Sequence, residues 1–306
     1  MKLFYGETDI YGDVSVNYCV HEMYAEGQAD TLVIRFNDPD GLWSKWNPAT
    51  GDEIRFTEGS GDTGKMFIHS MKSENGLFTI RAQSMPASGK VRRSKSWEGV
   101  RFLQVGNEIA ARHGLTFRSF GCADQVYPSL KQDNEGDFAL FSRLCTFEGC
   151  QMIIYDGALI AYRERYIEEQ TPQEVLEIAE NGVFSYKDNR TACFGSCEVS
   201  SGSYFGKFEI PDTEFTRVLR PEYPVRATSN AEAARFARGL LRNANKYGRT
   251  GRFTRSLMTG YAAASLAELK TPKASAWDGP VFIYKVRHDY AANKTTIYFR
   301  DIPEGY

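Results

Sequence analysis

The sequence has few residues with metal-binding or redox chemistry, and it has no segment suited to crossing a membrane. Its 306 residues include six cysteines and four histidines, and nowhere do eighteen apolar residues follow one another. A membrane-spanning helix needs such a run, so we expect no membrane insertion. The first residues also lack the apolar segment of a signal peptide, which indicates a soluble protein made in a cytoplasm.

Neither sign of charge dominates the chain. Lys and Arg number 37 and Asp and Glu number 39, which gives a net charge of −2. This balance offers no overall attraction for nucleic acid or for an anionic membrane. At this length we expect two or three domains, because single cores of this size are uncommon.

The cysteines form two loose pairs, Cys145/Cys150 and Cys193/Cys197, and two isolated residues. Structural zinc sites commonly use a tighter C-x2-C spacing, so we interpret the thiols as reduced side chains that pack in the core. No metal or other cofactor is predicted. The histidines converge on no site, and the sequence contains neither a G-x-S-x-G elbow nor an H-E-x-x-H motif. We therefore predict no catalytic residues and no enzymatic activity.

One glycine-rich segment, Gly59–Met66, imitates a nucleotide-binding loop. It matches the Walker A pattern through Lys65, but Met66 stands where Ser or Thr should hold magnesium. A true phosphate loop runs into a helix, whereas the residues after Lys65 alternate as a strand does. The segment is therefore interpreted as a turn between antiparallel strands.

The chain divides into three regions by its apolar pattern. Residues 1–90 have the two-residue period of strands and predict a first antiparallel β-barrel or sandwich. Residues 91–165 predict a small α/β domain. It has a helix over 97–113, a second helix from about 134, and a hairpin that turns at Asp156-Gly157.

Residues 166–306 predict a second β domain that contains helices. A capping box at Thr171–Glu174 predicts a short helix. Ser229 and Glu232 form another capping box and begin a long helix over 229–245. The predicted buried stripe of this helix is Ala233, Ala237, Leu240, Leu241 and Ala244. The fold class is thus α+β, mainly β, with two antiparallel β portions around a small α/β domain.

The long helix also carries a basic stripe. Arg235, Arg238 and Arg242 share one of its faces, opposite the alanine and leucine stripe. The plainest interpretation is a solvated face; the alternatives are a phosphate contact or a charged seam with a partner subunit. These arginines are the candidate subunit-interface residues. If they face an acidic surface of a ring partner or of a neighbouring domain, reversing Arg238 and Arg242 should weaken assembly without unfolding the subunit.

Segments along most of the chain resemble the late control protein D family of phage baseplate hub proteins. The strongest likeness is central, where Gly136 and the order of Leu140 and Phe141 are mild departures from the family's pattern. The segments that carry the resemblance are Leu32–Asp38, Ser94–Trp97, Ile109–Leu115, Gln132–Asp137, Leu140–Leu144 with Gly149, Tyr155–Gly157, Ala231–Ala234, Asn243–Lys246, Asp278–Gly279, Tyr284–His288 and Thr295–Arg300.

This resemblance implies a structural protein of a phage tail or related contractile injection machine. In such a hub, two tube-protein-like barrels per subunit form a homotrimeric, pseudo-six-fold ring. The implied partners are a second and third copy, the tail tube protein, a central spike or tail-tip protein and other baseplate proteins. DNA would pass through the lumen. The implied location is the virion's tail baseplate, after assembly in the host cytoplasm.

Two functions of other classes stay open at this point. A tail-associated hydrolase of cell-wall polymers would need paired carboxylates in a cleft. Glu168 and Glu169 are poor candidates if they lie on a strand, because neighbouring strand residues point to opposite faces. A nucleic-acid-binding module would use the basic region 235–255, and its binding would weaken with salt.

Overall fold

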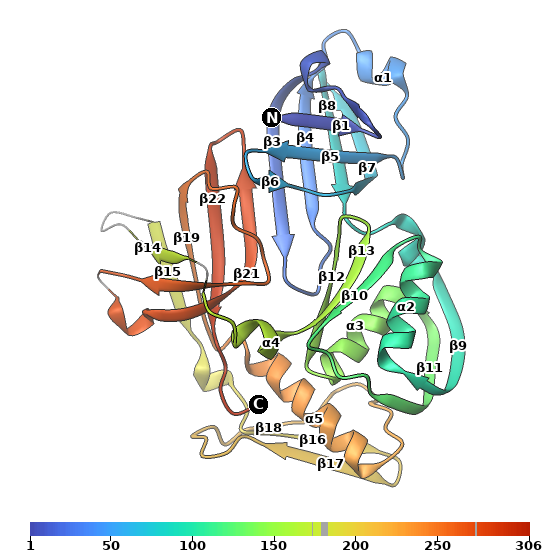
Figure 1. Cartoon of the computed structure of the whole chain (residues 1–306), viewed down its shortest axis with the longest axis vertical. Helices are drawn as coiled ribbons and strands as arrows, with labels where there is room; N and C mark the ends of the chain where they lie inside the picture. Colours follow the sequence, from blue (N-terminus) through green and yellow to red (C-terminus); the bar gives the residue numbers. More distant parts are fainter. Residues whose placement is uncertain (173, 179–182, 273) are drawn as a thin grey trace.

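The computed structural model describes residues 1–172, 174–178, 183–272 and 274–306. Figure 1 shows four parts: an N-terminal β portion, a second β portion beside it, a central α/β part, and a long helix over a small sheet near the C-terminus. None of the described helices has both the length and the apolar composition needed to cross a membrane.

The N-terminal β portion folds from strands whose apolar residues alternate. Leu32, Ile34 and Phe36 are fully buried on one face of β4, while Arg35 between them is exposed. The core of this part also holds Trp43, which stacks on Phe78. Its elements are β1 (Lys2–Tyr5), β2 (Thr8–Asp9), β3 (Ser15–Tyr24), β4 (Thr31–Asn37), α1 (Leu42–Trp46), β5 (Glu53–Glu58), β6 (Gly61–Asp62), β7 (Met66–Glu74) and β8 (Leu77–Gln83).

The second β portion has its own core around Ile283, Ile297 and Phe299. It is built from β14 (Val175–Glu177), β15 (Val183–Asp188), β19 (Arg249–Ser256), β20 (Ser265–Lys270), β21 (Gly279–Asp289) and β22 (Lys294–Asp301). The two β portions form one continuous sheet, because β21 pairs antiparallel with β3, placing Arg287 opposite Glu22. The path of the sheet is β15-β19-β22-β21-β3-β4-β8-β7-β5-β1-β2. The predicted α+β, mainly β fold class is confirmed.

The central α/β part contacts the N-terminal β portion through the turn at Asp156, whose carboxylate accepts the Lys65 backbone N–H at 3.1 Å. It contains β9 (Arg92–Arg101), α2 (Phe102–Arg112), β10 (Thr116–Phe120), β11 (Val126–Gly136), α3 (Asp137–Phe147), β12 (Cys150–Tyr155), β13 (Ala158–Arg163) and α4 (Glu164–Glu168). The predicted hairpin is confirmed: β12 pairs with β13, and Asp156 and Gly157 both have the positive φ of a type I′ turn.

The predicted helix over 97–113 begins too early. Residues 92–101 form β9, which pairs with β11, and Trp97 lies opposite Leu130. The helix α2 begins only at Phe102. The helix expected after Thr171 is also wrong, since Val175–Glu177 is strand β14, parallel to β20; Gln173 lies outside the described residues.

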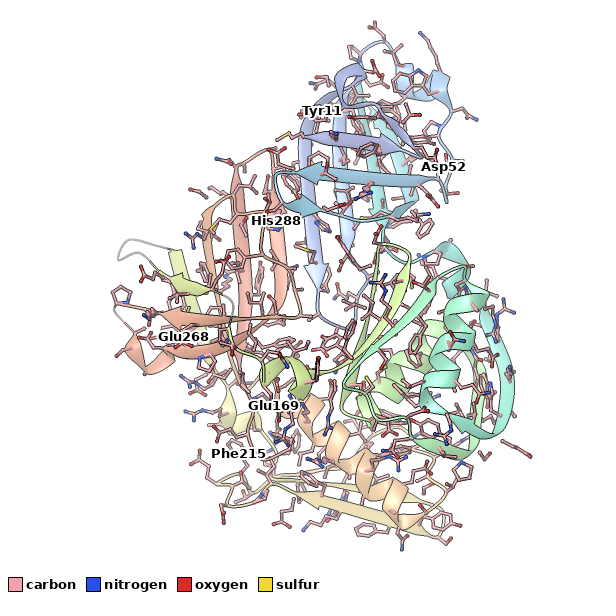
Figure 2. The ribbon with its side chains drawn as sticks, in the orientation of Figure 1. Tyr11, Asp52, Glu169, Phe215, Glu268 and His288 are labelled. Carbon is pink, nitrogen blue, oxygen red and sulfur yellow. The ribbon has the colours of Figure 1, made fainter. Side chains whose placement is uncertain are left out.

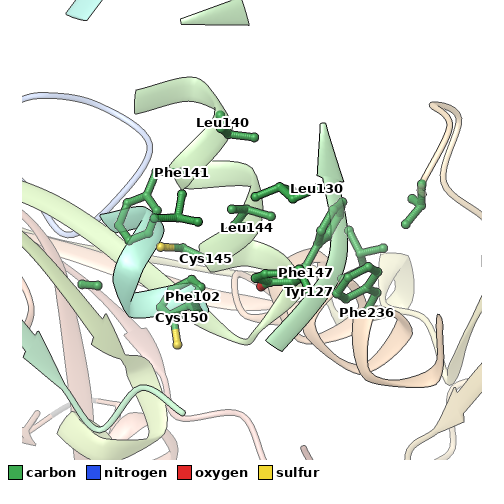
Figure 3. Packing of buried hydrophobic residues seen from close by; sticks show 14 of the residues in the cluster. Phe102, Tyr127, Leu130, Leu140, Phe141, Leu144, Cys145, Phe147, Cys150 and Phe236 are labelled. Carbon is green, nitrogen blue, oxygen red and sulfur yellow. The ribbon is translucent and has the colours of Figure 1, made fainter. Parts of the chain in front are cut away.

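The long helix is confirmed as α5 (Asn230–Asn245), but its place in the fold differs from the prediction. Together with β16 (Ser196–Ser201), β17 (Tyr204–Glu209) and β18 (Val218–Leu219), it shares one hydrophobic core with the central part. Figure 3 shows Phe236 of α5 beside Phe147 of α3, with ring centroids 4.6 Å apart. The long helix therefore packs on the central part, while the expected domain over residues 166–306 stays a prediction. Ala244, expected in its buried stripe, is exposed.

The glycine-rich segment is a turn, as predicted. Residues 61–62 pair with β5, and the chain enters strand β7 at Met66. The Lys65 ammonium pairs with Glu53 at 2.9 Å. All six cysteines are free thiols, and Cys145 and Cys150 pack in the central core. Over the described part of the chain, no group of three or more His, Cys, Asp or Glu residues is arranged to hold a metal ion.

Candidate functional site: the charged junction between α4 and α5

The candidate site lies where α4, α5 and the end of β22 meet near the centre of the molecule (Figure 1). Helix α5 begins as its sequence predicts: the Ser229 hydroxyl accepts the Glu232 backbone N–H at 3.1 Å. The Glu232 carboxylate in turn accepts the Thr228 N–H at 2.6 Å. Its apolar stripe, which includes Ala233 and Ala237, is buried in the shared core, and this orientation turns the basic stripe toward α4.

Buried carboxylates of α4 receive these cations. Glu164 and Glu168 are four residues apart and therefore share one helix face. Glu164 accepts hydrogen bonds from Arg300 at 2.9 Å, from Lys246 at 3.2 Å and from Arg242 at 3.3 Å. Glu168 accepts Arg300 at 2.9 Å and also pairs with Arg242. We call these five residues the junction network.

The electrostatics of the junction network favour the ionised form of Glu164. Burial alone raises the pKa of Glu164, but Lys246, Arg300 and Arg242 more than offset this effect, and its pKa falls to about 2. Arg300 and Lys246 have side chains no more than 1% exposed. Lys246 also binds Glu26, in the connection between β3 and β4. The network therefore ties four parts of the chain: α4, α5, β22 and the N-terminal β portion.

The structure separates the three arginines of the predicted interface. Arg242 is buried in the junction network with a side chain 7% exposed, so its expected outward position is wrong. Arg235 binds the buried Glu148 of the central part at 2.9 Å. Arg238 is exposed and lies over the ring of Phe208. The predicted interface contact therefore stays a prediction for Arg238, while Arg235 and Arg242 bind carboxylates of their own chain.

Sequence reasoning missed the acidic half of this junction. Glu168 and Glu169 were interpreted as strand residues, yet Glu168 ends a helix whose i and i+4 carboxylates face inward. The signal that could have identified it is the Glu164-x-x-x-Glu168 spacing, which is helical. The partners themselves lie 74 to 136 residues away in the sequence.

A small hollow opens beside the junction network, with a volume of about 160 Å³. Its wall is rich in guanidinium groups, and among its described lining residues Glu148 is the only acidic side chain. The main-chain oxygen of Tyr306, which also lines it, accepts a hydrogen bond from Arg165 at 3.0 Å. The arginines that line it are Arg163, Arg165, Arg235, Arg238 and Arg242. Burial lowers the pKa of Arg238, and the charges of Arg163, Arg165 and Arg242 lower it further.

A second cavity, of about 250 Å³, lies where the two β portions meet the tip of the β12–β13 hairpin. His21 and His288 are fully buried beside it, 6.5 Å apart between ring centroids, and Figure 2 shows His288 in the sheet there. Burial and the neighbouring His288 lower the pKa of His21 to about 3. Asp30 also lines the cavity, and burial raises the pKa of its carboxyl to about 7, although the Tyr24 N–H that it accepts acts in the opposite direction.

Asp30 should make stability fall as pH rises. Between the unfolded pKa of about 4 and the folded pKa of about 7, the folded chain holds a proton that the unfolded chain releases. Asp30→Asn should therefore raise the free energy of unfolding by about 2–4 kcal/mol at pH 8 and change it little at pH 4. Urea unfolding of both proteins at the two pH values measures this; an equal effect at both would contradict it.

The fold is that of phage tail proteins. The 43 kDa tail protein of prophage MuSo2 from Shewanella oneidensis matches 98% of this chain and 99% of its own, with a TM-score of 0.72 and 11% identity. A tail protein from Neisseria meningitidis matches 98% of this chain and 95% of its own, with a TM-score of 0.76 and 10% identity.

The same fold occurs outside phages. The E. coli c3393 protein, a component of the type VI secretion system described as similar to the T4 tail proteins gp27 and gp5, covers all of this chain. The match spans 78% of that protein, with a TM-score of 0.61 and 13% identity. By sequence alone, the chain matches no family model and no curated protein.

Proposed function

We propose that this chain is the baseplate hub of a phage tail or a related contractile injection machine, and that it acts as a structural protein without catalytic activity. Three copies would form a pseudo-six-fold ring that joins the tail tube to a central spike. The observation that carries this proposal is the continuous sheet formed by two β portions, in a fold matched end to end by tail proteins.

The continuous sheet supports a ring of this kind. Each chain presents two β portions side by side, each with its own core. Three such chains would present six portions, and cyclic symmetry requires only that opposite faces of one chain be complementary. The chain could in this way match a six-fold tube on one side and a three-fold spike on the other.

One face of the sheet is polar along both portions, which suits the wall of a channel. Cross-strand neighbours share a face, and Lys285, Arg287 and Arg35 lie on the face opposite the two cores. Along β3, β4, β7, β8, β15, β19, β21 and β22, cations outside the junction network outnumber carboxylates on this face. The cations are Arg35, Lys72, Arg81, Lys187, Arg252, Lys285, Arg287 and Lys294, and the carboxylates are Glu22, Glu74 and Asp289. We propose that this face lines the lumen through which DNA passes.

The hydrolase alternative has less support in the geometry. A glycosidase needs two carboxyl groups that face a substrate across a cleft. The carboxylates gathered at the junction, Glu164 and Glu168, are buried and bound by Arg242 and Arg300. Neither is free to act on a polymer.

The mass of the purified protein in solution tests the ring. Light scattering after size exclusion should give about three times 34.5 kDa, and negative-stain images should show rings. The measurement should be repeated with added tail tube protein, because a hub can trimerise on its partner. A chain that stays monomeric at high concentration, alone and with the tube protein, would contradict the proposal.

A further inference from the structure

The arginine-lined hollow beside the junction network contains two arginines that no described carboxylate pairs with. The other three are bound: Arg242 by Glu164 and Glu168, Arg235 by Glu148 and Glu232, and Arg165 by Glu169 at 2.6 Å and by the Tyr306 main-chain oxygen at 3.0 Å. Arg163 and Arg238 make no ion pair with any described residue, although both line the hollow. One terminal nitrogen of Arg235 is buried without a hydrogen bond, but it lies 3.5 Å from the Glu232 carboxylate and is therefore ion-paired.

Because Arg163 and Arg238 line the hollow without an ion-pair partner, their charges would attract an anion placed between them. Guanidinium groups bind carboxylates through paired, charge-assisted hydrogen bonds, which are the stronger kind. The volume of about 160 Å³ is enough for a single carboxylate head group and little more.

The surroundings of the hollow indicate where that carboxylate comes from. A wider groove of about 570 Å³ shares Arg165, Arg238, Arg242 and Tyr306 with the hollow, so the two are continuous. Apart from these, its wall combines four apolar residues, Phe208, Pro211, Ile302 and Pro303, with three carboxylates, Glu168, Glu169 and Glu304. Glu168 is held by Arg242 and Arg300, and Glu169 by Arg165. A free inorganic anion would gain nothing from such a wall, whereas a peptide would bury apolar side chains on it.

We propose that the hollow and its groove bind a segment of a partner protein, with an acidic side chain between Arg163 and Arg238 and apolar neighbours along the groove. This inference rests on the proposed function only in naming a protein as the source of the carboxylate. It assigns the interface role to Arg163 and Arg238 rather than to Arg235 and Arg242.

A peptide array tests this without requiring assembly. The probes are immobilised, acetylated hexapeptides with a central Glu and varied apolar flanks, each printed beside the same sequence with Gln. The full-length protein should bind the Glu member of the best pairs about tenfold or more tightly. Arg238→Gln and Arg163→Gln should abolish this preference while leaving the melting temperature unchanged. Arg226→Gln, an exposed arginine outside the hollow, should keep it.

The outcomes separate the possible ligands. A wild-type protein with no preference for Glu over Gln, or a preference that survives Arg238→Gln, would overturn the proposal. Sulfate serves as a second probe, added at constant ionic strength. If sulfate raises the melting temperature of the wild-type protein but not of Arg238→Gln, and no preference for Glu is seen, the hollow is a small-anion pocket. That result would also overturn the proposal. A monomeric protein that shows the preference would contradict the ring and leave this site intact.

Discussion

Replacing Glu164 with glutamine is expected to lower the free energy of unfolding by about 3–5 kcal/mol at pH 7. The side chain keeps its shape but loses the charge that balances Arg300, Lys246 and Arg242, and Arg300 is completely buried. Removing one partner of a buried ion cluster leaves the others uncompensated in a medium of low polarity. Urea unfolding measures the loss.

The matched control is Glu169→Gln, at the residue that directly follows the same short helix. Glu169 also pairs with an arginine, Arg165 at 2.6 Å, but its side chain is 61% exposed. Exposed pairs of this spacing contribute about 0.3–0.5 kcal/mol. Equal effects of the two substitutions would mean that burial does not set the strength of the junction network.

The Glu164 carboxylate also determines how the free energy of unfolding changes as pH falls. Its folded pKa of about 2 is below its ordinary value of 4.5. Between these two pH values the folded chain therefore holds fewer protons than the unfolded chain. Its stabilising contribution is thus complete above about pH 4.5 and is lost as pH falls toward 2. Glu164→Gln should lose less stability than the parent over that window. A steeper acid loss in the variant would contradict this.

Reversing the charge of Arg242 should destabilise the chain by more than about 4 kcal/mol, because the new carboxylate would lie against Glu164 and Glu168. Arg238→Glu, one turn earlier on the same helix, should stay within about 0.5 kcal/mol of the parent, since Arg238 is exposed. Thermal melting and far-UV circular dichroism of both variants measure this. A folded, stable Arg242→Glu protein would mean that Arg242 points outward to solvent, as its helical spacing predicts.

The local pattern predicted α5 well and its environment poorly. The capping box and the apolar stripe correctly placed the helix, because both signals lie within one stretch of chain. The spacing of Arg235, Arg238 and Arg242 correctly put them on one face. What covers that face comes from α4 and from Glu148, 74 to 87 residues away, so the sequence could not distinguish a solvated arginine from a buried one.

The strands of the β portions followed from their two-residue period, whereas the pairing that joins the portions did not. The contact of β3 with β21 links residues more than 260 positions apart. Similarly, Trp97–Arg101 was read as helix, but it extends β9 because it pairs with β11. Long-range strand pairing overrode the local preference there.

The most direct test of the proposed hub is a three-dimensional reconstruction of the assembled ring by electron cryo-microscopy. The account predicts three chains whose six β portions surround a channel, with Arg35, Arg287 and Arg252 of the polar sheet face directed into it. A ring with this face on its outside, or an assembly without three-fold symmetry, would contradict the account.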